Sequence, residues 1–300
     1  MKLAIFGRIT ERTDLAFLAR FFDFLKEKKV AYLVHYKYSE ELEKVMPEWP
    51  DHIAPFILTD EKQLDECDFA YSFGGDGTFL NTAMVVKGIL PVLGVNFGRL
   101  GFLTTVTQEH LLAATTEIMK DMYRIDLRWG IEVESSPAGL FGDYNFGLND
   151  FTIHKSESNE MITVHTYING EFLNSYWGDG LVIATPTGST AYSLSCGGPI
   201  IHPNANALVV TPVAPHSLTV RPMILADDCV ISFSLETRTG RAMVALDTRT
   251  VPVSDKVEIA IRKSKEPVKM LRVQSGNYLD TLRGRLMWGT DKRNWKERMG

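Results

Sequence analysis

The string Phe-Gly-Gly-Asp-Gly-Thr at residues 73–78 places a carboxylate in the middle of a glycine-rich turn. It follows the apolar run 69–73 and precedes an apolar helical pattern, so we expect a strand, a tight turn and a helix. Glycines let the backbone turn sharply and approach a ligand, and amides at a helix start favour phosphate. Asp76 has the chemistry to orient a hydroxyl, accept its proton or hold Mg²⁺. The same string also fits a plain corner with a helix-capping Asp or Thr.

A second segment, residues 178–200, is dense in glycine and small hydroxyl residues. Its apolar part, 181–184, leads into Thr-Pro-Thr-Gly-Ser-Thr-Ala-Tyr-Ser at 185–193. Such a loop offers hydrogen-bond donors and close backbone approach to a ligand that carries ribose hydroxyls and phosphates. Tyr192 adds an aromatic surface on which a flat ring can stack. The alternative is a surface turn that binds nothing.

The pair Asn149-Asp150 lies between these two segments. The amide of an asparagine donates and accepts at once, which matches the edge of adenine. A carboxylate such as Asp150 suits ribose hydroxyls. Taken alone, an Asn-Asp pair is also an ordinary turn sequence.

The composition is that of a globular protein, with 45% hydrophobic and 23% charged residues. A net charge of -5 argues against a general nucleic-acid binder, and apolar runs such as 89–95 are too short to cross a membrane. The opening run, 2–6, is expected to be a first strand rather than a signal peptide. The three cysteines, Cys67, Cys196 and Cys229, lack paired or zinc-ligand spacing, which favours a reducing cytoplasm.

Strand and helix patterns alternate over the first hundred residues, which predicts a parallel sheet covered by helices. The expected strands are 2–6, 30–36, 69–73 and 91–95, and the expected helices are 14–28 and 79–87. After a helix at 108–121, short strand-like segments with turn signals predict a β-rich domain. These segments are 125–134, 145–153, 162–168, 181–185, 208–213, 217–225, 229–236, 241–246, 256–262 and 268–273. A basic helix is expected at 277–298.

Together these segments resemble the NAD kinase family. Three signatures match in order: residues 74–78, the Asn149-Asp150 pair, and the stretch 179–200. The segments 96–104 and 215–222 are also similar to family sequences, so the resemblance spans about residues 70–275.

The resemblance implies a two-domain α/β plus all-β fold. Residues 1–104 with about 275–300 would form an α/β domain with a parallel sheet, to which the C-terminal tail returns. Residues 105–274 would form a β-rich, β-sandwich-like domain that binds NAD. The implied reaction moves the γ-phosphate of ATP to the 2′-hydroxyl of the adenosine ribose of NAD, giving NADP and ADP. A divalent cation, Mg²⁺, would arrive with ATP, and the chain would form a homodimer or homotetramer without nucleic-acid or membrane partners.

The resemblance also implies roles for individual residues. Asp76 resembles the catalytic carboxylate next to the 2′-hydroxyl, Gly77 would let the cofactor approach, and Phe102 would pack beside the adenosine. Asn149 would read the adenine and Asp150 would hold ribose hydroxyls. The other residues expected to line the cofactor groove are Asp179, Thr190, Ala191, Tyr192, Ser193, Leu194, Ser195, Ala214 and Arg249.

Four positions depart from the family pattern. The family usually has Glu where this chain has Asp150. Some relatives have Gln where this chain has Arg249, and an arginine there would favour a phosphate or carboxylate partner. Trp177 replaces a polar or basic residue, and Cys196 replaces a small alanine. We expect these changes to affect individual contacts and to leave the reaction unchanged.

Phosphoryl transfer depends mainly on positioning and charge neutralisation. We therefore expect Asp76 to orient the 2′-hydroxyl and to receive its proton late, contributing ~10²–10⁴-fold. One alternative is a lipid kinase of the diacylglycerol and sphingosine kinase class, which shares a related glycine-rich turn but lacks the string at 185–193. Another is an NAD(P)-binding sensor without catalysis, which would keep the cofactor groove and lose the carboxylate.

Overall fold

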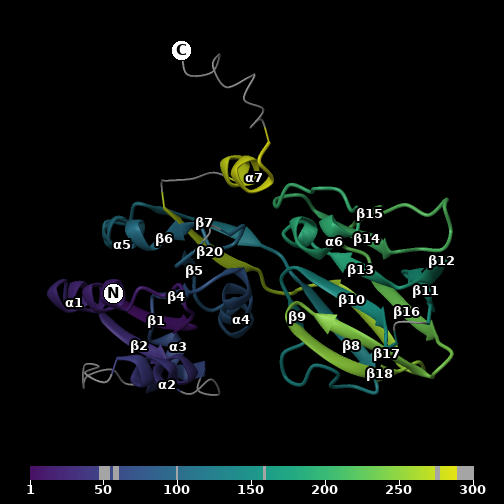
Figure 1. Cartoon of the computed structure of the whole chain (residues 1–300), viewed down its shortest axis with the longest axis horizontal. Coiled ribbons are helices and arrows are strands. Elements are labelled where there is room, and N and C mark those ends of the chain that lie inside the picture. The colour runs from purple at the N-terminus through teal and green to yellow at the C-terminus, as the bar shows by residue number, and fades with distance from the viewer. Residues whose placement is uncertain (47–54, 57–60, 99–100, 158–159, 274–277, 289–300) are drawn as a thin grey trace, which may run out of the picture. The chain divides into compact units, whose positions relative to one another are not determined.

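The computed structural model describes residues 1–46, 55–56, 61–98, 101–157, 160–273 and 278–288. Contacts between residues divide the chain into two compact units. The first contains Met1–Asp126 and the chain from Lys269 onward, and the second is Leu127–Val268. The first unit therefore carries both the purple-to-blue elements and the yellow ones in Figure 1.

The first unit is built on an eight-stranded sheet of order β3-β2-β1-β4-β5-β20-β7, with β6 paired to β5. The pairs from β3 through β20 are parallel. The strands are β1 (Lys2–Gly7), β2 (Ala31–His35), β3 (Pro55–Phe56), β4 (Phe69–Phe73), β5 (Val92–Asn96), β6 (Val106–Thr107), β7 (Tyr123–Arg128) and β20 (Val268–Val273).

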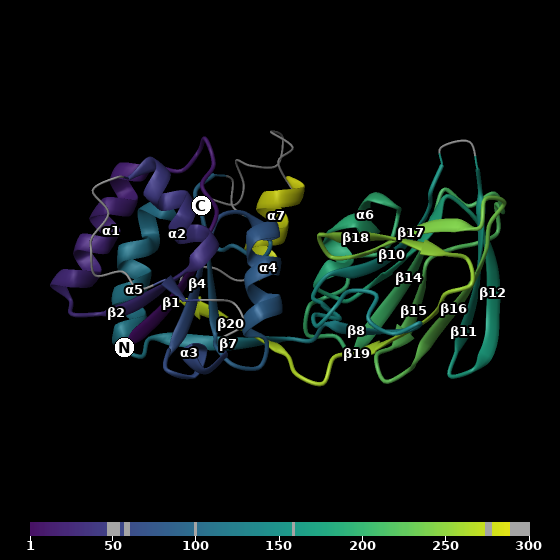
Figure 2. The same cartoon turned by 90° about the horizontal axis from the view of Figure 1, so that it is seen from below.

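Helices cover both faces of this sheet (Figure 2). On one face α1, α2 and α5 bury their apolar sides against β1, β4 and β5. On the other face lies α4, where the Thr82 hydroxyl donates to Ser72 Oγ of β4 at 2.9 Å. The helices are α1 (Leu15–Glu27), α2 (Tyr36–Val45), α3 (Glu61–Asp65), α4 (Asp76–Val86), α5 (Leu111–Met119), which follows a 3-10 turn at Gln108–His110, and α7 (Tyr278–Leu286).

The second unit contains two six-stranded antiparallel sheets, β15-β14-β13-β10-β17-β18 and β12-β11-β16-β19-β8-β9. One apolar core joins them, in which the rings of Phe151 and Phe233 stack 6.3 Å apart. The elements are β8 (Ile131–Ser136), β9 (Phe146–Gly147), β10 (Asp150–Lys155), β11 (Ile162–Ile168), β12 (Glu171–Gly178), β13 (Gly180–Ala184), a 3-10 turn (Gly188–Thr190), α6 (Tyr192–Ser195), β14 (Ala207–Val213), β15 (Met223–Ala226), β16 (Ile231–Glu236), β17 (Arg241–Leu246), β18 (Arg249–Ser254) and β19 (Glu258–Lys263).

The predicted fold class is confirmed: a parallel α/β unit and a β-rich, sandwich-like unit. The division between them lies elsewhere than expected. The boundary falls after Asp126 rather than after residue 104, because β6 and the apolar side of α5 join the core of the first unit. The segment 268–273, expected in the β-rich domain, instead pairs in parallel with β5 in the first unit. The tail also returns there, where the Arg285 guanidinium lies 5.8 Å from the centre of the Phe102 ring.

Several local expectations differ from the structure. The run 125–134 is two strands, β7 and β8, which are separated by Trp129 and Gly130. The strand expected at 217–225 is confined to Met223–Ala226, and α2, β12 and β18 were not expected. The helix expected at 277–298 is described from Tyr278 to Leu286, and residues 289–298 lie outside the described residues. Within the described part of the chain, no helix is long and apolar enough to cross a membrane.

Candidate active site

The glycine-rich turn of the first unit joins β4 to α4. Gly74 has φ +149°, a backbone conformation that favours glycine, and a Cβ there would lie 2.5 Å from Thr78 Oγ1. Asp76 is the first residue of α4, and the exposed Gly75 before it is the N-cap. The Asp76 side chain does not cap this helix, since its hydrogen bonds go to a distant loop. The plain capped corner is therefore not what forms here.

The Asp76 carboxylate is held by four hydrogen bonds from residues 102–104. Oδ2 accepts the N–H of Phe102 at 2.8 Å. Oδ1 accepts the N–H of Leu103 at 3.1 Å, the N–H of Thr104 at 3.0 Å and the Thr104 hydroxyl at 2.9 Å. Hydrogen bonds donated to a carboxylate are among the strong ones, so these four fix the Asp76 side chain in one orientation.

A second layer of contacts fixes the loop itself. Asn96, at the end of β5, donates from Nδ2 to Thr104 Oγ1 at 2.9 Å, and Thr104 is fully buried. Gly101 donates its N–H to Thr104 O at 3.1 Å. A Cβ at Gly101 would overlap Asp76 Oδ1 and lie 2.5 Å from Thr104 Oγ1. Only glycine fits this position, because the loop backbone lies directly against the carboxylate.

The other predicted residues of the first unit flank this cluster. Gly77 is exposed next to Asp76, and Phe102 is half-buried with Arg285 of α7 over its ring. The structure therefore brings Asp76, Gly77 and Phe102 together, although Phe102 is 26 residues away from Asp76 in the chain.

In the second unit, the Asn149-Asp150 pair forms the entry to β10 and is held by Asp247. The Asp247 carboxylate accepts the N–H groups of Leu148 at 2.8 Å, Asn149 at 2.8 Å and Asp150 at 3.2 Å. On the other side, the N–H of Thr185 donates to Asn149 O at 2.9 Å. Asn149 Oδ1 is buried and has no hydrogen-bond partner among the described residues. A buried acceptor left open in this way is suited to a ligand donor.

Asp150 is buried, with 7% of its surface exposed. Burial, followed by the nearby charge of Asp247, raises the pKa of the Asp150 carboxyl to about 7. Burial also raises the pKa of Asp247, and the three N–H donors and Arg249 act against that rise. The three N–H donors and Arg249 therefore favour the ionised form of Asp247.

Three hydroxyls of the hydroxyl-rich loop, residues 185–198, form hydrogen bonds with other groups of the protein. Thr185 Oγ1 donates to Leu148 O at 2.6 Å and accepts the N–H of Gly188 at 3.0 Å. Ser189 Oγ donates to Pro186 O at 2.7 Å, and Ser193 Oγ contacts Thr211 Oγ1 at 2.9 Å. Both serines are fully buried. The expectation that this string offers hydroxyl donors to a ligand does not hold for these three residues, whose hydroxyls shape the loop.

The remaining residues of the loop face outward to different degrees. Tyr192 and Ser195 are exposed, and Thr190, Ala191 and Leu194 are half-buried. The Tyr192 ring lies 5.5 Å from the ring of His154. Burial, with smaller contributions that include Cys196, Asp150 and Asp179, raises the pKa of Tyr192 to about 12. Tyr192 therefore stays a neutral hydroxyl within electrostatic reach of both predicted carboxylates.

Asp179 lies between β12 and β13, where it pairs with a lysine. Lys155 Nζ is 2.7 Å from Asp179 Oδ1. Ala214, two residues before His216, has φ +43°, an uncommon conformation for a residue with a side chain. The rings of Trp177 and His216 lie 4.3 Å apart, and the His216 N–H donates to Trp177 O at 2.9 Å. The structure thus gathers Asp179 and Ala214 at one end of β13 and β14.

Arg249 follows Asp247 by two residues, but its guanidinium binds main-chain carbonyls. It donates from Nη1 to Tyr144 O and from Nη2 to Phe146 O, and it lies 5.5 Å from the centre of the Phe141 ring. Arg249 therefore binds the segment 144–146, which precedes Asn149 in the chain.

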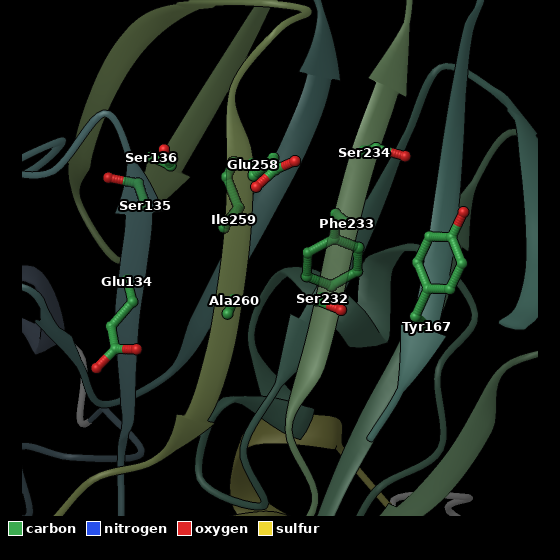
Figure 3. Close-up of a pocket in the computed structure, with 10 residues that line it drawn as sticks. All are labelled: Glu134, Ser135, Ser136, Tyr167, Ser232, Phe233, Ser234, Glu258, Ile259 and Ala260. Carbon is green, nitrogen blue, oxygen red and sulfur yellow. The ribbon is translucent and has the colours of Figure 1, made fainter. Parts of the chain in front are cut away.

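Two further observations concern other kinds of site. Among the described residues, no three His, Cys, Asp or Glu side chains gather as they would around a metal ion. A hollow of about 500 Å³ lies on the outer face of the sheet that contains β11, β16, β19 and β8 (Figure 3). The small Ser232, Ser234 and Ala260 form its floor, between Tyr167 and Glu134. None of the residues predicted from the sequence lines this hollow.

Asp247, Lys155, Thr185 and Gly101 were not singled out in the sequence. Asp247 is 97 residues away from Asp150, in a hairpin turn whose Asp-Thr dipeptide predicts only a turn. Lys155 is the last residue of β10, two residues beyond the strand expected at 145–153, and the sequence does not show which acid it meets. These contacts come from pairing between distant strands, which local patterns do not encode.

The sequence matches two protein-family models. Residues 3–123 match the ATP-NAD kinase N-terminal domain, and residues 148–273 match the ATP-NAD kinase C-terminal domain. The NAD kinase of Cytophaga hutchinsonii is 40% identical over 295 residues, which cover 98% of this chain and 100% of the relative. The NAD kinase of Bacteroides fragilis strain ATCC 25285 is 38% identical over 295 residues, with the same coverage of 98% and 100%.

Two solved structures are similar to this chain. The yeast NADH kinase complexed with NADH superimposes with a TM-score of 0.83 at 23% identity, covering 96% of this chain and 88% of the other. An NAD kinase from Archaeoglobus fulgidus in complex with ATP gives 0.73 at 24% identity, covering 96% and 99%. At these identities the likeness shows the fold. The sequence matches reach further, and on their evidence the chain belongs to the ATP-NAD kinase family.

Proposed function

We propose that this enzyme transfers the γ-phosphate of ATP to the 2′-hydroxyl of the adenosine ribose of NAD, with Asp76 as the residue that orients the hydroxyl. Relatives named NAD kinase, which match the chain over 98% of its length, support the reaction. The observation that supports the role of Asp76 is its carboxylate, fixed by four hydrogen bonds at the start of α4.

The hydrogen bonds to Asp76 are divided unequally between its two oxygens. Oδ1 accepts three, from Leu103 and Thr104, and Oδ2 accepts one, from Phe102. A carboxylate oxygen has room for about two good hydrogen bonds. Oδ2 is therefore the oxygen with a lone pair left for the 2′-hydroxyl.

The chemistry then follows from this position. The 2′-oxygen forms a bond to the γ-phosphorus, the bond from that phosphorus to the β,γ-bridging oxygen breaks, and ADP leaves with the electron pair. The hydroxyl proton passes to Asp76 Oδ2 late in the step, because a loose transition state places little demand on a base before then. The exposed amides of the turn around Gly75 and Gly77 would hold phosphate oxygens at the start of α4. The divalent cation is part of the second substrate and would arrive bound to ATP.

The second unit would supply recognition of NAD. The open Oδ1 of Asn149 accepts a hydrogen bond from the exocyclic amine of adenine, and Asp150 accepts from ribose hydroxyls. The outward part of the loop would line the cofactor groove through Thr190, Ala191, Tyr192, Leu194 and Ser195. Ser193, being buried, would act through the shape of the loop. Asp179, with Lys155, and Ala214 would lie toward the nicotinamide side.

A coupled assay for NADP with purified protein, ATP, Mg²⁺ and NAD tests this function. Wild type should form NADP, and Asp76→Asn should lose ~10²–10⁴-fold in kcat while still folding. Asp23→Asn, an exposed aspartate of α1, is the matched control and should turn over normally. Near-normal turnover by Asp76→Asn would remove Asp76 from the reaction, and NAD binding without NADP from wild type would favour a sensor.

The assembly and location of the enzyme belong to the same proposal. We expect a homodimer or homotetramer, as the family resemblance implies, in the cytoplasm. The three cysteines are free thiols in the structure, which suits a reducing compartment.

A further inference from the structure

The hairpin between β17 and β18 is tied to the Asn149-Asp150 turn in both directions. The Asp247 carboxylate accepts the N–H groups of Leu148, Asn149 and Asp150 at 2.8, 2.8 and 3.2 Å. The N–H of Asp247 donates to Asp150 O at 2.9 Å. Four hydrogen bonds therefore connect one aspartate to three successive residues that are far away in the sequence.

Asn149 is also held from its other side. Its carbonyl oxygen accepts the N–H of Thr185 at 2.9 Å, and Gly188 packs so closely that a Cβ there would lie 2.7 Å from Asn149 Cα. Both main-chain polar groups of Asn149 are thus occupied, and the position of its Cα is fixed. The side chain starts from this fixed point, and its Oδ1 is buried without a hydrogen-bond partner among the described residues.

We propose that Asp247 is a positioning residue for NAD, because its carboxylate fixes the turn that presents the Asn149 side chain to the adenine. The inference rests on the proposed function and deepens it. Asp247 acts through the main chain of the turn and makes no contact with the substrate itself.

The residue type suits this role. Three N–H groups converge on the position, and a carboxylate offers two oxygens that only accept hydrogen bonds. Asp247 has φ +53°, a left-handed conformation that Asp and Asn adopt more readily than other residues with side chains. Asp247→Asn therefore keeps the backbone and the size, but it replaces one acceptor by an NH₂ group that faces an N–H donor.

Arg249 supports the same hairpin from its second strand. Its guanidinium donates to Tyr144 O and Phe146 O, in the chain just before the turn, and its charge favours the ionised form of Asp247. The hairpin thus binds the N–H groups of 148–150 with an anion and the carbonyls of 144 and 146 with a cation. This contact gives Arg249 a part in placing the turn.

The test is the affinity of ligand-free protein for NAD, measured by isothermal titration, alongside kcat and both KM values. Asp247→Asn should raise the Kd and KM for NAD by about 10- to 100-fold and leave the KM for ATP within about twofold. Asn149→Ala should have a similar effect. Adding Asn149→Ala to Asp247→Asn should then cost much less than the product of the two single effects, since both act through one contact. Asp255→Asn, at the other end of β18, is the matched control and should bind NAD like wild type.

Multiplicative effects of the two substitutions, or an unchanged Kd for NAD in Asp247→Asn, would overturn the inference while the proposed function stood. Failure of wild type to bind NAD would overturn both. Amide hydrogen exchange of ligand-free wild type adds a measurement that needs no variant to fold. The N–H groups of Leu148, Asn149 and Asp150 should exchange slowly together, and rapid exchange of all three would contradict a fixed turn.

Discussion

Two aspartates, one in each unit, accept main-chain N–H groups from three successive residues of a distant loop. Asp76 binds the N–H groups of residues 102–104, and Asp247 binds those of residues 148–150. Each cluster also contains a closely packed glycine, but the two contacts differ: Gly101 lies against the Asp76 carboxylate, and Gly188 lies against the main chain of Asn149. The two clusters are therefore alike in the hydrogen bonds to the aspartate.

The two clusters differ in which side chain keeps an oxygen that can accept a further hydrogen bond from a ligand. At Asp76 the loop holds the carboxylate, and Oδ2 keeps a lone pair for a hydroxyl. At Asp247 the carboxylate holds the loop, and the open acceptor is Asn149 Oδ1. Under the proposed function, the same contact would position a reacting group in one unit and a recognition group in the other. Disturbing the first should lower kcat, and disturbing the second should raise the KM for NAD.

The Asp247 cluster also contains a second carboxyl group, that of Asp150, and the largest expected effect is its influence on stability as the pH changes. The Asp150 pKa is about 7, against an ordinary 3.8, because of burial and then Asp247. Between about pH 4 and 7 the folded state holds a proton that the unfolded state has released, so stability should fall as pH rises through this window. The shift corresponds to about 4 kcal/mol. Asp150→Asn should escape this loss.

The measurement is the urea unfolding midpoint of ligand-free wild type and Asp150→Asn from pH 4 to 8. The stability of the variant relative to wild type should increase up to about pH 7 and then level off. Asp179→Asn, whose carboxylate is paired with Lys155, is the comparison variant. Parallel curves for wild type and Asp150→Asn would show that Asp150 ionises as an ordinary aspartate.

Local patterns in the sequence were sufficient for much of the fold. The apolar segments of β1, β4 and α1 were placed within two residues, because their burial follows the strand and helix periods. The edge strand β18 was missed because Pro252 interrupts it, and proline is tolerated at a sheet edge. The segment of β20 was recognised as a strand, but a strand buried on both faces carries no signal of which sheet it joins.

The candidate site divides in the same way. The glycine-rich turn and the Asn149-Asp150 pair are recognisable from local sequence. In the structure they lie in the two hydrogen-bonded clusters around Asp76 and Asp247. Local sequence does not show whether a serine hydroxyl will be buried or exposed. Ser193 is buried against Thr211, whereas Ser195, two positions later, is exposed. The role of Asp247 could not be predicted, because no local pattern connects its hairpin turn to the loop at 148–150, about a hundred residues earlier.

The two close glycines offer a sharper comparison of the clusters. Gly101→Ala would place a methyl group against Asp76 Oδ1, and Gly188→Ala would place one against the main chain of Asn149. A displacement of about 1 Å at a reacting group costs about 10²-fold. We therefore expect kcat to fall about 100-fold in Gly101→Ala, and the KM for NAD to rise by a similar factor in Gly188→Ala.

Steady-state kinetics with varied NAD and varied ATP separate these outcomes. Each variant should also lose about 1–3 kcal/mol of stability from overpacking, so assays belong well below its thermal midpoint. Gly284→Ala is the control, since a Cβ at this exposed position of α7 meets nothing within 4 Å. If both variants changed the same kinetic parameter, the division of labour between the clusters would be wrong.

The smallest effect should come from the two threonines that brace the loops. Thr104 Oγ1 donates to Asp76 and accepts from Asn96, while Thr185 Oγ1 donates to Leu148 O and accepts from Gly188. Valine keeps the shape and removes the hydroxyl, leaving a buried donor unpaired at a cost of about 1–3 kcal/mol. Thr104→Val should reduce kcat about tenfold, and Thr185→Val should raise the KM for NAD about tenfold, with serine restoring each. Thr104→Val removes only one of the four hydrogen bonds to Asp76. If it lowered kcat as much as Asp76→Asn does, the Thr104 hydroxyl would take part in the reaction directly, and its role would not be limited to orienting the carboxylate.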